Sequence, residues 1–118
     1  MACVNEQNCG KIVFLYNKLM EAKSTTTKSS RETVAFAKKF LAKALKEVPK
    51  DSPLIFYLSG ELGAGKTQFV KGLASALGIR DNITSPTFVL TKRYKVGKRL
   101  FFHIDCYRIY DAEDARHI

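Results

Sequence analysis

The 118-residue chain is short enough for one domain, and its hydrophobic content of 46% excludes a protein that is disordered throughout. Twenty Lys and Arg against 11 Asp and Glu give a formal charge of +9, which favours an anionic partner such as nucleotide, RNA or an acidic protein surface. The basic residues are spread over several predicted elements, so a solvated basic face and a nucleic-acid surface are both open interpretations.

The cysteine pattern and the length of the apolar runs indicate the compartment in which the protein is expected to work. Cys3, Cys9 and Cys106 are odd in number and form no C-x-x-C pair, which predicts neither a disulfide framework nor a zinc site. The longest apolar run near the N-terminus, residues 12–16, is too short for a signal-peptide core or a membrane span. We therefore expect a soluble, cytoplasmic protein.

The first predicted boundary follows a polar stretch. Residues 24–30 have the composition of a linker, so we expect residues 1–28 to form an N-terminal extension of unknown role and residues 29–118 to form the domain. The apolar run at 12–16 is too short to distinguish a strand from a helix.

An amphipathic helix is predicted after this boundary. Residues 29–32 (Ser-Ser-Arg-Glu) match a capping box, and apolar residues recur at helical spacing until Pro49. The apolar stripe comprises Val34, Ala37, Leu41, Ala44, Leu45 and Val48. Lys38, Lys39, Lys43 and Lys46 lie mainly off this stripe, where a helix packed on a sheet presents its solvated face.

The next elements are predicted as a strand, a glycine-rich loop and a second helix. Residues 54–58 are continuously apolar, which is typical of a strand buried on both faces in a parallel sheet. The helix is expected to begin at Thr67 and to end at Gly78. Its inward-facing residues are expected to be Phe69, Val70, Leu73, Ala76 and Leu77.

The C-terminal third is predicted to contain two more strands. Residues 88–94 and 100–105 have strand composition, and the turn at 96–98 allows them to pair as a hairpin. Residues 111–114 look like the acidic first turn of a helix that the remaining residues are too few to complete. We therefore expect the domain to be incomplete at its C-terminal side.

The loop carries the clearest chemical motif. Gly60-x-x-x-x-Gly65-Lys66-Thr67 satisfies G-x-x-x-x-G-K-[ST], in which backbone N–H groups and the helix dipole hold phosphates. Lys66 is expected to bridge the β- and γ-phosphates, and the hydroxyl of Thr67 to bind Mg²⁺. The preceding strand and following helix are the setting that this motif requires, so we predict nucleotide binding rather than a structural turn. The other predicted loop contacts are Leu62, Gly63, Ala64 and Gly65.

Two further segments carry candidate polar groups. Asp105 ends an apolar strand, where it can hold magnesium through water or orient the attacking water, or else cap a turn. Residues 84–87 (Thr-Ser-Pro-Thr) lie where switch proteins sense the γ-phosphate, although the same residues make an ordinary turn.

The residues around Asp105 are assigned simpler roles. His103 can be a hydrogen-bonded core histidine or a base, and we favour the core role; Cys106 is interpreted as a packing residue. Tyr107 and Arg108 can close over phosphate, and Arg108 can equally form a surface ion pair.

Three segments together resemble the TsaE (YjeE-type) ATPases. They are SGELGAGKT at 59–67, SPTF at 85–88 and HIDCYR at 103–108. The loop alone is generic, but its combination with S-P-T-[FY] and H-x-D-x-Y-R is specific to that family, and the resemblance covers residues 29–118. It implies an α/β, P-loop NTPase-like three-layer sandwich with a mostly parallel sheet, here lacking its C-terminal strands.

The resemblance also implies a function. TsaE proteins are bacterial ATPases that support threonylcarbamoyladenosine formation in tRNA by binding TsaB and TsaD, with ATP and Mg²⁺ as ligands. It implies contact with tRNA that is indirect or weak, and no membrane. The residues so implied are Lys66 and Asp105 for catalysis, Thr67 and Asp105 for magnesium, Ser85 and Thr87 for the switch, and Thr33 as a nucleotide contact.

Some features depart from the family pattern. Its strand with a magnesium-associated Glu in a W-x-E-type motif has no match here, and Cys106 replaces the more usual Leu. Two other functions stay open: a small P-loop kinase, which would need an acceptor site, and a non-catalytic module that binds nucleotide without turnover.

Overall fold

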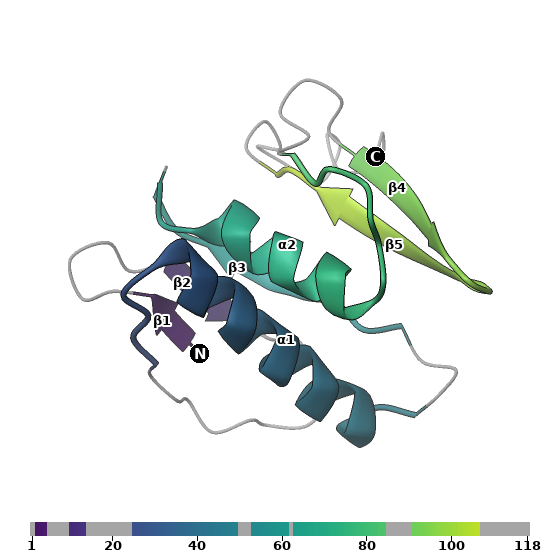
Figure 1. Cartoon of the computed structure of the whole chain (residues 1–118), viewed down its shortest axis with the longest axis horizontal. Coiled ribbons are helices and arrows are strands. Elements are labelled where there is room, and N and C mark those ends of the chain that lie inside the picture. The colour runs from purple at the N-terminus through teal and green to yellow at the C-terminus, as the bar shows by residue number, and fades with distance from the viewer. Residues whose placement is uncertain are drawn as a thin grey trace.

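The computed structural model describes residues 2–4, 10–13, 25–49, 53–61, 63–84 and 91–106. These residues form an α/β arrangement of helices and short strands. In chain order the elements are β1 (Ala2–Val4), β2 (Gly10–Val13), α1 (Ser30–Glu47), β3 (Tyr57–Ser59), α2 (Lys66–Ala76), β4 (Thr91–Val96) and β5 (Arg99–Ile104). In Figure 1, α1 and α2 lie side by side in front of β3, and the hairpin of β4 and β5 lies beyond α2.

Helix α1 begins at the predicted capping residues. The Ser29 hydroxyl accepts a hydrogen bond from the Glu32 N–H at 3.2 Å, and the Glu32 carboxylate accepts one from the Lys28 N–H at 2.7 Å. The first bond satisfies a first-turn N–H that the helix leaves without an intrahelical acceptor, and the second ties the residue before the cap to the first turn. The helix ends where Val48 turns extended ahead of Pro49.

The packed face of α1 differs in part from the predicted stripe. Ala37 and Leu41 are buried as predicted, but Leu45 is 41% exposed. Phe36 and Phe40, which the spacing did not single out, pack instead on Phe69 of α2, with ring centroids about 6 Å away. The stripe is therefore rotated toward the two phenylalanines, because their large rings bury more apolar area against α2 than Leu45 would.

Helix α2 packs closely against α1. Phe69, Val70 and Leu73 are buried as predicted, whereas Ala76 is exposed. A methyl group placed on Gly72 would lie 2.5 Å from the Ala37 Cβ. The two small residues thus allow the helix backbones to approach where larger side chains would keep them apart.

The strand pairing corrects the expected parallel sheet. Every strand pair among the described residues is antiparallel: β1 with β2, β2 with β3, and β4 with β5. Two stretches of the predicted extension, β1 and β2, thus join β3 in one sheet. The division of the chain at residue 28 stays a prediction.

The hairpin of β4 and β5 forms as predicted. Gly97 and Lys98 make its turn, and the φ of +58° at Gly97 is a left-handed value that glycine adopts without steric cost. The register places Tyr94 opposite Phe101 and Lys92 opposite His103. Residues 88–90 of the predicted strand, and the predicted acidic helix at 111–114, lie outside the described residues.

Residues 54–58 and strand β5 bury side chains on one face. Leu54, Phe56, Leu58 and Phe101 pack on the helices. The residues that alternate with them are exposed by 44 to 62%: Ile55, Tyr57, Leu100, Phe102 and Ile104. The prediction that residues 54–58 are buried on both faces is therefore wrong for the described part of the chain. There the helices cover only one face of the strands, so helices and strands form two layers rather than three.

None of the described helices has the length and apolar composition needed to cross a membrane.

Candidate functional site

The glycine-rich loop links β3 to α2. Gly63 and Gly65 have φ values of +82° and +96°, in the left-handed region that other residues rarely adopt. The Ala64 N–H donates to the Glu61 carbonyl at 3.1 Å and closes a turn inside the loop. Glycine at these two positions therefore allows the backbone to curl, as the motif requires.

The start of α2 leaves backbone donors facing the loop. Gly65 is the capping residue and has no side chain to accept a hydrogen bond from the helix, and the Phe69 N–H is the first to bond within it, to Gly65 at 3.0 Å. The amides of the first turn, together with the positive end of the helix dipole, are suited to bind an anion.

Lys66 folds back over this loop. Its ammonium donates to the carbonyl of Gly60 at 2.5 Å and to that of Glu61 at 2.8 Å. The positive charge is thereby held across the opening of the loop, beside the first turn of α2, by bonds that a phosphate oxygen can replace. The loop thus holds a cation and uncapped amides in one place.

A second polar group lies at the end of the hairpin. Asp105 follows β5 directly and is half-buried, and His103 lies opposite Lys92 of β4. The Lys92 ammonium donates to the Thr84 hydroxyl, which ties β4 to the loop after α2. This contact places Thr84, the first residue of the predicted switch segment, at the hairpin.

The environment of His103 disfavours its charged form. Burial of the ring lowers the pKa below the ordinary 6.5, the Asp105 carboxylate opposes this by raising it, and the Lys92 ammonium lowers it further. The Nδ1 atom of His103 is buried and has no hydrogen-bond partner among the described residues. The interpretation of His103 as a hydrogen-bonded core residue is therefore not confirmed at Nδ1.

The glycine-rich loop and Asp105 both follow strands that pack on the same hydrophobic core. Leu58 precedes the loop by two residues, Phe101 precedes Asp105 by four, and both side chains pack on the two core clusters centred on α2. The clusters contain Ala37, Leu41, Phe69 and Leu73 in one, and Val70, Ala74 and Ile83 in the other. Both strands are thus packed against the helix that begins at Lys66.

Thr33 lies in a different setting from the loop residues. It is 3% exposed, its hydroxyl lies 2.8 Å from that of Thr27, and it donates to the Ser29 carbonyl at 3.2 Å. These bonds give Thr33 a structural role at the start of α1, and its contact with nucleotide stays a prediction. Leu62, Ser85, Thr87, Tyr107 and Arg108 lie outside the described residues.

Lys92 contacts Thr84 and lies beside His103, but it was not among the residues predicted from the sequence. A signal for it was present, because a two-residue turn at Gly97 and Lys98 fixes the strand register and pairs Lys92 with His103.

The donor set suits magnesium bound together with a nucleotide. Within the described ranges, no three His, Cys, Asp or Glu side chains converge as a metal cage would need. Thr67, in the first turn of α2, offers a hydroxyl, and magnesium commonly combines one or two protein ligands with phosphate oxygens and water. The residues present therefore fit such an ion.

Comparison with known proteins gives a consistent result. Residues 6–118 match the family described as "Threonylcarbamoyl adenosine biosynthesis protein TsaE". The proteins named "tRNA threonylcarbamoyladenosine biosynthesis protein TsaE" of Haemophilus influenzae and Bacillus subtilis are 37% identical over 79 residues and 42% identical over 88 residues. That of Treponema pallidum is 52% identical over 60 residues. No solved structure matches the chain significantly.

The alignments cover a larger share of this chain than of its relatives. They span 67%, 75% and 51% of this chain, but 49%, 52% and 44% of the Haemophilus, Bacillus and Treponema proteins. The chain therefore spans about half the length of these relatives. Since the family match extends over nearly the whole chain and includes the loop, the hairpin and Asp105, the chain belongs to the TsaE family.

Proposed function

We propose that this chain binds ATP with magnesium in a P-loop NTPase-like fold and hydrolyses it slowly, in support of threonylcarbamoyladenosine formation in tRNA. The observation that carries the proposal is the Lys66 ammonium, held over the carbonyls of Gly60 and Glu61 beside the uncapped first turn of α2. The family and its relatives supply the pathway, since their printed names specify tRNA threonylcarbamoyladenosine biosynthesis.

The loop would bind the phosphates of ATP. The N–H groups of Gly63, Ala64 and Gly65 and of the first turn of α2 would donate to phosphate oxygens, and Lys66 would exchange its carbonyl acceptors for the β- and γ-phosphates. Thr67, and Asp105 through water, would hold magnesium, which would neutralise charge on the phosphates. Leu62 and Thr33 are proposed as further contacts.

Hydrolysis would depend on positioning. The Asp105 carboxylate, at the end of β5, would orient a water for in-line attack on the γ-phosphate, while Lys66 and the loop amides stabilise the charge that develops. Ser85 and Thr87 would report the presence of the γ-phosphate, and the Lys92 bond to neighbouring Thr84 offers a route to the hairpin.

The partners are part of the proposal. TsaB and TsaD would bind the ATP-loaded chain in the cytoplasm and raise its turnover, and contact with tRNA would be indirect or weak.

ATP binding and hydrolysis, measured with Mg²⁺ for the chain alone and with TsaB and TsaD, test this function. Turnover that rises with both partners is the expected result. Binding without turnover under every condition would indicate a non-catalytic nucleotide-binding module, and ADP release that requires a small-molecule acceptor would indicate a kinase. Failure to bind ATP would overturn the proposal.

A further inference from the structure

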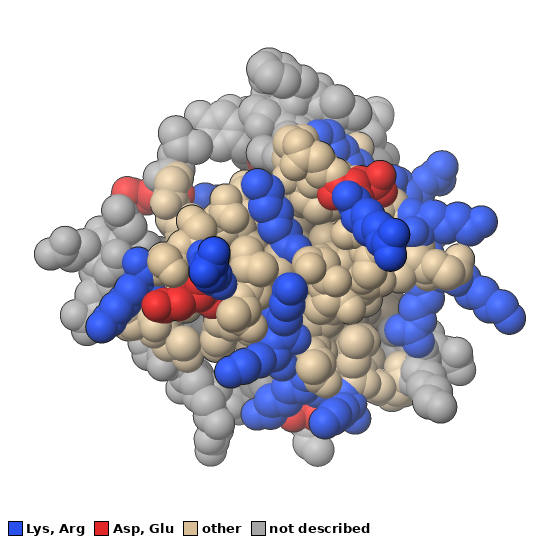
Figure 2. Space-filling view, viewed as in Figure 1, with Lys and Arg blue, Asp and Glu red and all other residues tan. Residues whose placement is uncertain are grey.

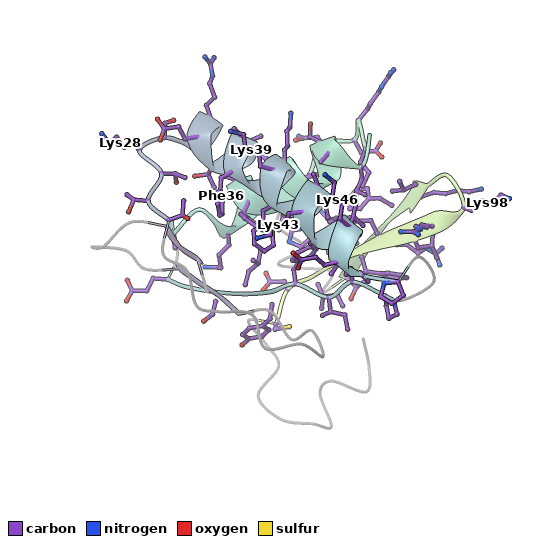
Figure 3. All side chains as sticks on the ribbon, turned by 90° about the horizontal axis from the view of Figure 1, so that it is seen from below. Lys28, Phe36, Lys39, Lys43, Lys46 and Lys98 are labelled. Carbon is purple, nitrogen blue, oxygen red and sulfur yellow. The ribbon has the colours of Figure 1, made fainter. Side chains whose placement is uncertain are left out.

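Helix α1 carries three lysines in line on its exposed side. Lys39, Lys43 and Lys46, here called the lysine stripe, are all exposed and lie four and three residues apart, so their side chains share one face of the helix. The seven residues from the first to the last span about 10 Å of helix axis. Figure 3 labels the three lysines along α1 and Lys98 at the tip of the hairpin.

The charge of the stripe is not balanced along the helix. The acids of α1 are Glu32 and Glu47, one in the first turn and one at the last residue. Glu32 already accepts the Lys28 N–H as part of the cap. Figure 2 shows Lys and Arg spread over the face that α1 and α2 present, with few acids among them. Lysines so close repel one another, and an anionic partner would relieve that repulsion.

Local interactions within the helix act on two of the three lysines. Lys46 lies in the last turn of α1, where a cation interacts favourably with the helix dipole. Lys43 lies four residues before Glu47, a spacing at which the two opposite charges attract, whereas Lys39 has no acid three or four residues away in α1. The three lysines therefore keep a net positive charge on one face, which a ligand with several anionic groups in a row would offset.

The chemistry of the stripe favours phosphate over other anions. The cores of protein interfaces are depleted in lysine and enriched in aromatic residues, but the phenylalanines of α1 are packed inward on Phe69. A membrane surface needs an apolar helix face, and that face of α1, with Ala37 and Leu41, is buried against α2. A row of lysines without exposed aromatics is typical of contact with a nucleic-acid backbone.

We propose that the lysine stripe binds the sugar–phosphate backbone of a folded RNA. A duplex presents about six phosphates over 10 Å of its axis, so each lysine of the stripe has a phosphate within reach. The charge argument stands without the nucleotide site, and only the choice of RNA rests on the proposed function. This contact would be direct but weak, and it would lie on α1, apart from the ATP-binding loop.

The test compares two triple variants of the full 118-residue chain. Fluorescence anisotropy with a labelled RNA hairpin, at several salt concentrations, measures binding. K39Q/K43Q/K46Q is expected to weaken binding at least about tenfold near 100 mM salt, and to reduce the slope of log affinity against log salt by about two to three. The matched control K28Q/K95Q/K98Q removes the same charge from exposed lysines outside α1, and is expected to change affinity less than about threefold.

Further measurements distinguish RNA binding by the lysine stripe from the proposed binding and hydrolysis of ATP. The arginine triple K39R/K43R/K46R keeps the charge and should keep RNA binding. Lys66→Ala should keep RNA binding while binding ATP more weakly, and the stripe variant should keep ATP binding and its circular dichroism spectrum. If both glutamine triples weakened RNA binding equally, the effect would come from net charge alone, and the proposal would be overturned. The proposal would also be overturned if the parent chain did not bind RNA but bound anionic vesicles or an acidic protein through the lysine stripe.

Discussion

The Lys66 ammonium and the Gly60 carbonyl are joined by a hydrogen bond of 2.5 Å across the glycine-rich loop. Because the second bond of the ammonium, to Glu61, is also to a backbone carbonyl, the lysine is held in position by the loop itself. In the proposed function, phosphates would meet a cation that is already ordered, which would reduce the entropy lost on binding.

Replacement of Lys66 should therefore affect nucleotide binding first. Lys66→Ala removes a charge-assisted hydrogen bond to phosphate, so we expect ATP to bind about 10- to 100-fold more weakly. Titration with a fluorescent ATP analogue measures the change. Lys71→Ala, on the same helix but outside its first turn, is the matched control and should leave affinity within about twofold. Equal losses in the two variants would contradict the assignment.

Asp105 is expected to affect hydrolysis rather than binding. Asp105→Asn keeps the size of the side chain but removes the charge that orients water, so turnover with TsaB and TsaD should fall about 100-fold or more. Steady-state phosphate release, alongside ATP affinity, separates the two effects. Asp81→Asn, an exposed carboxylate after α2, is the control. Unchanged turnover in the Asp105 variant would remove Asp105 from the mechanism.

The contact between Gly72 and Ala37 should limit stability. In Gly72→Ala the new methyl would lie 2.5 Å from the Ala37 Cβ and 2.7 Å from the Val34 carbonyl, so the helices must move apart. Overpacking costs about 1–3 kcal/mol, against a gain of about 1 kcal/mol in helix propensity, so urea denaturation should show a net loss.

Two further variants identify the cause of that loss. The double variant A37G/G72A removes the side-chain clash but loses about 1 kcal/mol of helix propensity at residue 37, so it should be more stable than G72A if that clash costs more than about 1 kcal/mol. Ser75→Ala, exposed on the same helix, changes propensity alone and should not destabilise. A Gly72→Ala protein more stable than the parent would show that the close approach is not needed.

The cap of α1 offers a matched pair of serines. Ser29→Ala removes the hydroxyl that accepts the Glu32 N–H and should cost about 1 kcal/mol of unfolding free energy. Ser30→Ala changes the next residue, the first of the helix, and should cost less than about 0.5 kcal/mol. Urea midpoints compare the two. Similar losses would mean that the cap contributes little.

His103 should make stability depend on pH. Its pKa in the folded chain lies below the 6.5 of the unfolded chain, because burial disfavours the charged ring. The unfolded state therefore takes up the proton first as the pH falls. Stability from this group is complete above about pH 6.5 and is lost as the pH falls from there through the folded pKa.

Urea denaturation between pH 8 and pH 5 measures this dependence. In His103→Gln the fall below pH 6.5 should be smaller than in the parent, since the ring no longer titrates. Identical pH profiles for the two proteins would show that another group causes the loss.

Local chemistry was enough to predict several features. The capping serine, the proline after α1, and the turn at Gly97 and Lys98 act over a few residues, and the structure confirms the helix start, the helix end and the hairpin. The family was likewise evident from three short segments, and the comparisons confirm it. The loop, the helix after it and Asp105 follow the predicted order along the chain.

Only the tertiary structure decided how these elements meet. Residues 54–58 are apolar throughout, but the alternation of a strand leaves Ile55 and Tyr57 exposed where helices cover one face alone. The antiparallel pairing of β2 with β3 depends on residues far apart in the sequence, and so does the approach of Gly72 to Ala37. Capping and turn preferences are encoded by neighbouring residues, whereas strand partners and helix contacts are selected by the free energy of packing the whole chain.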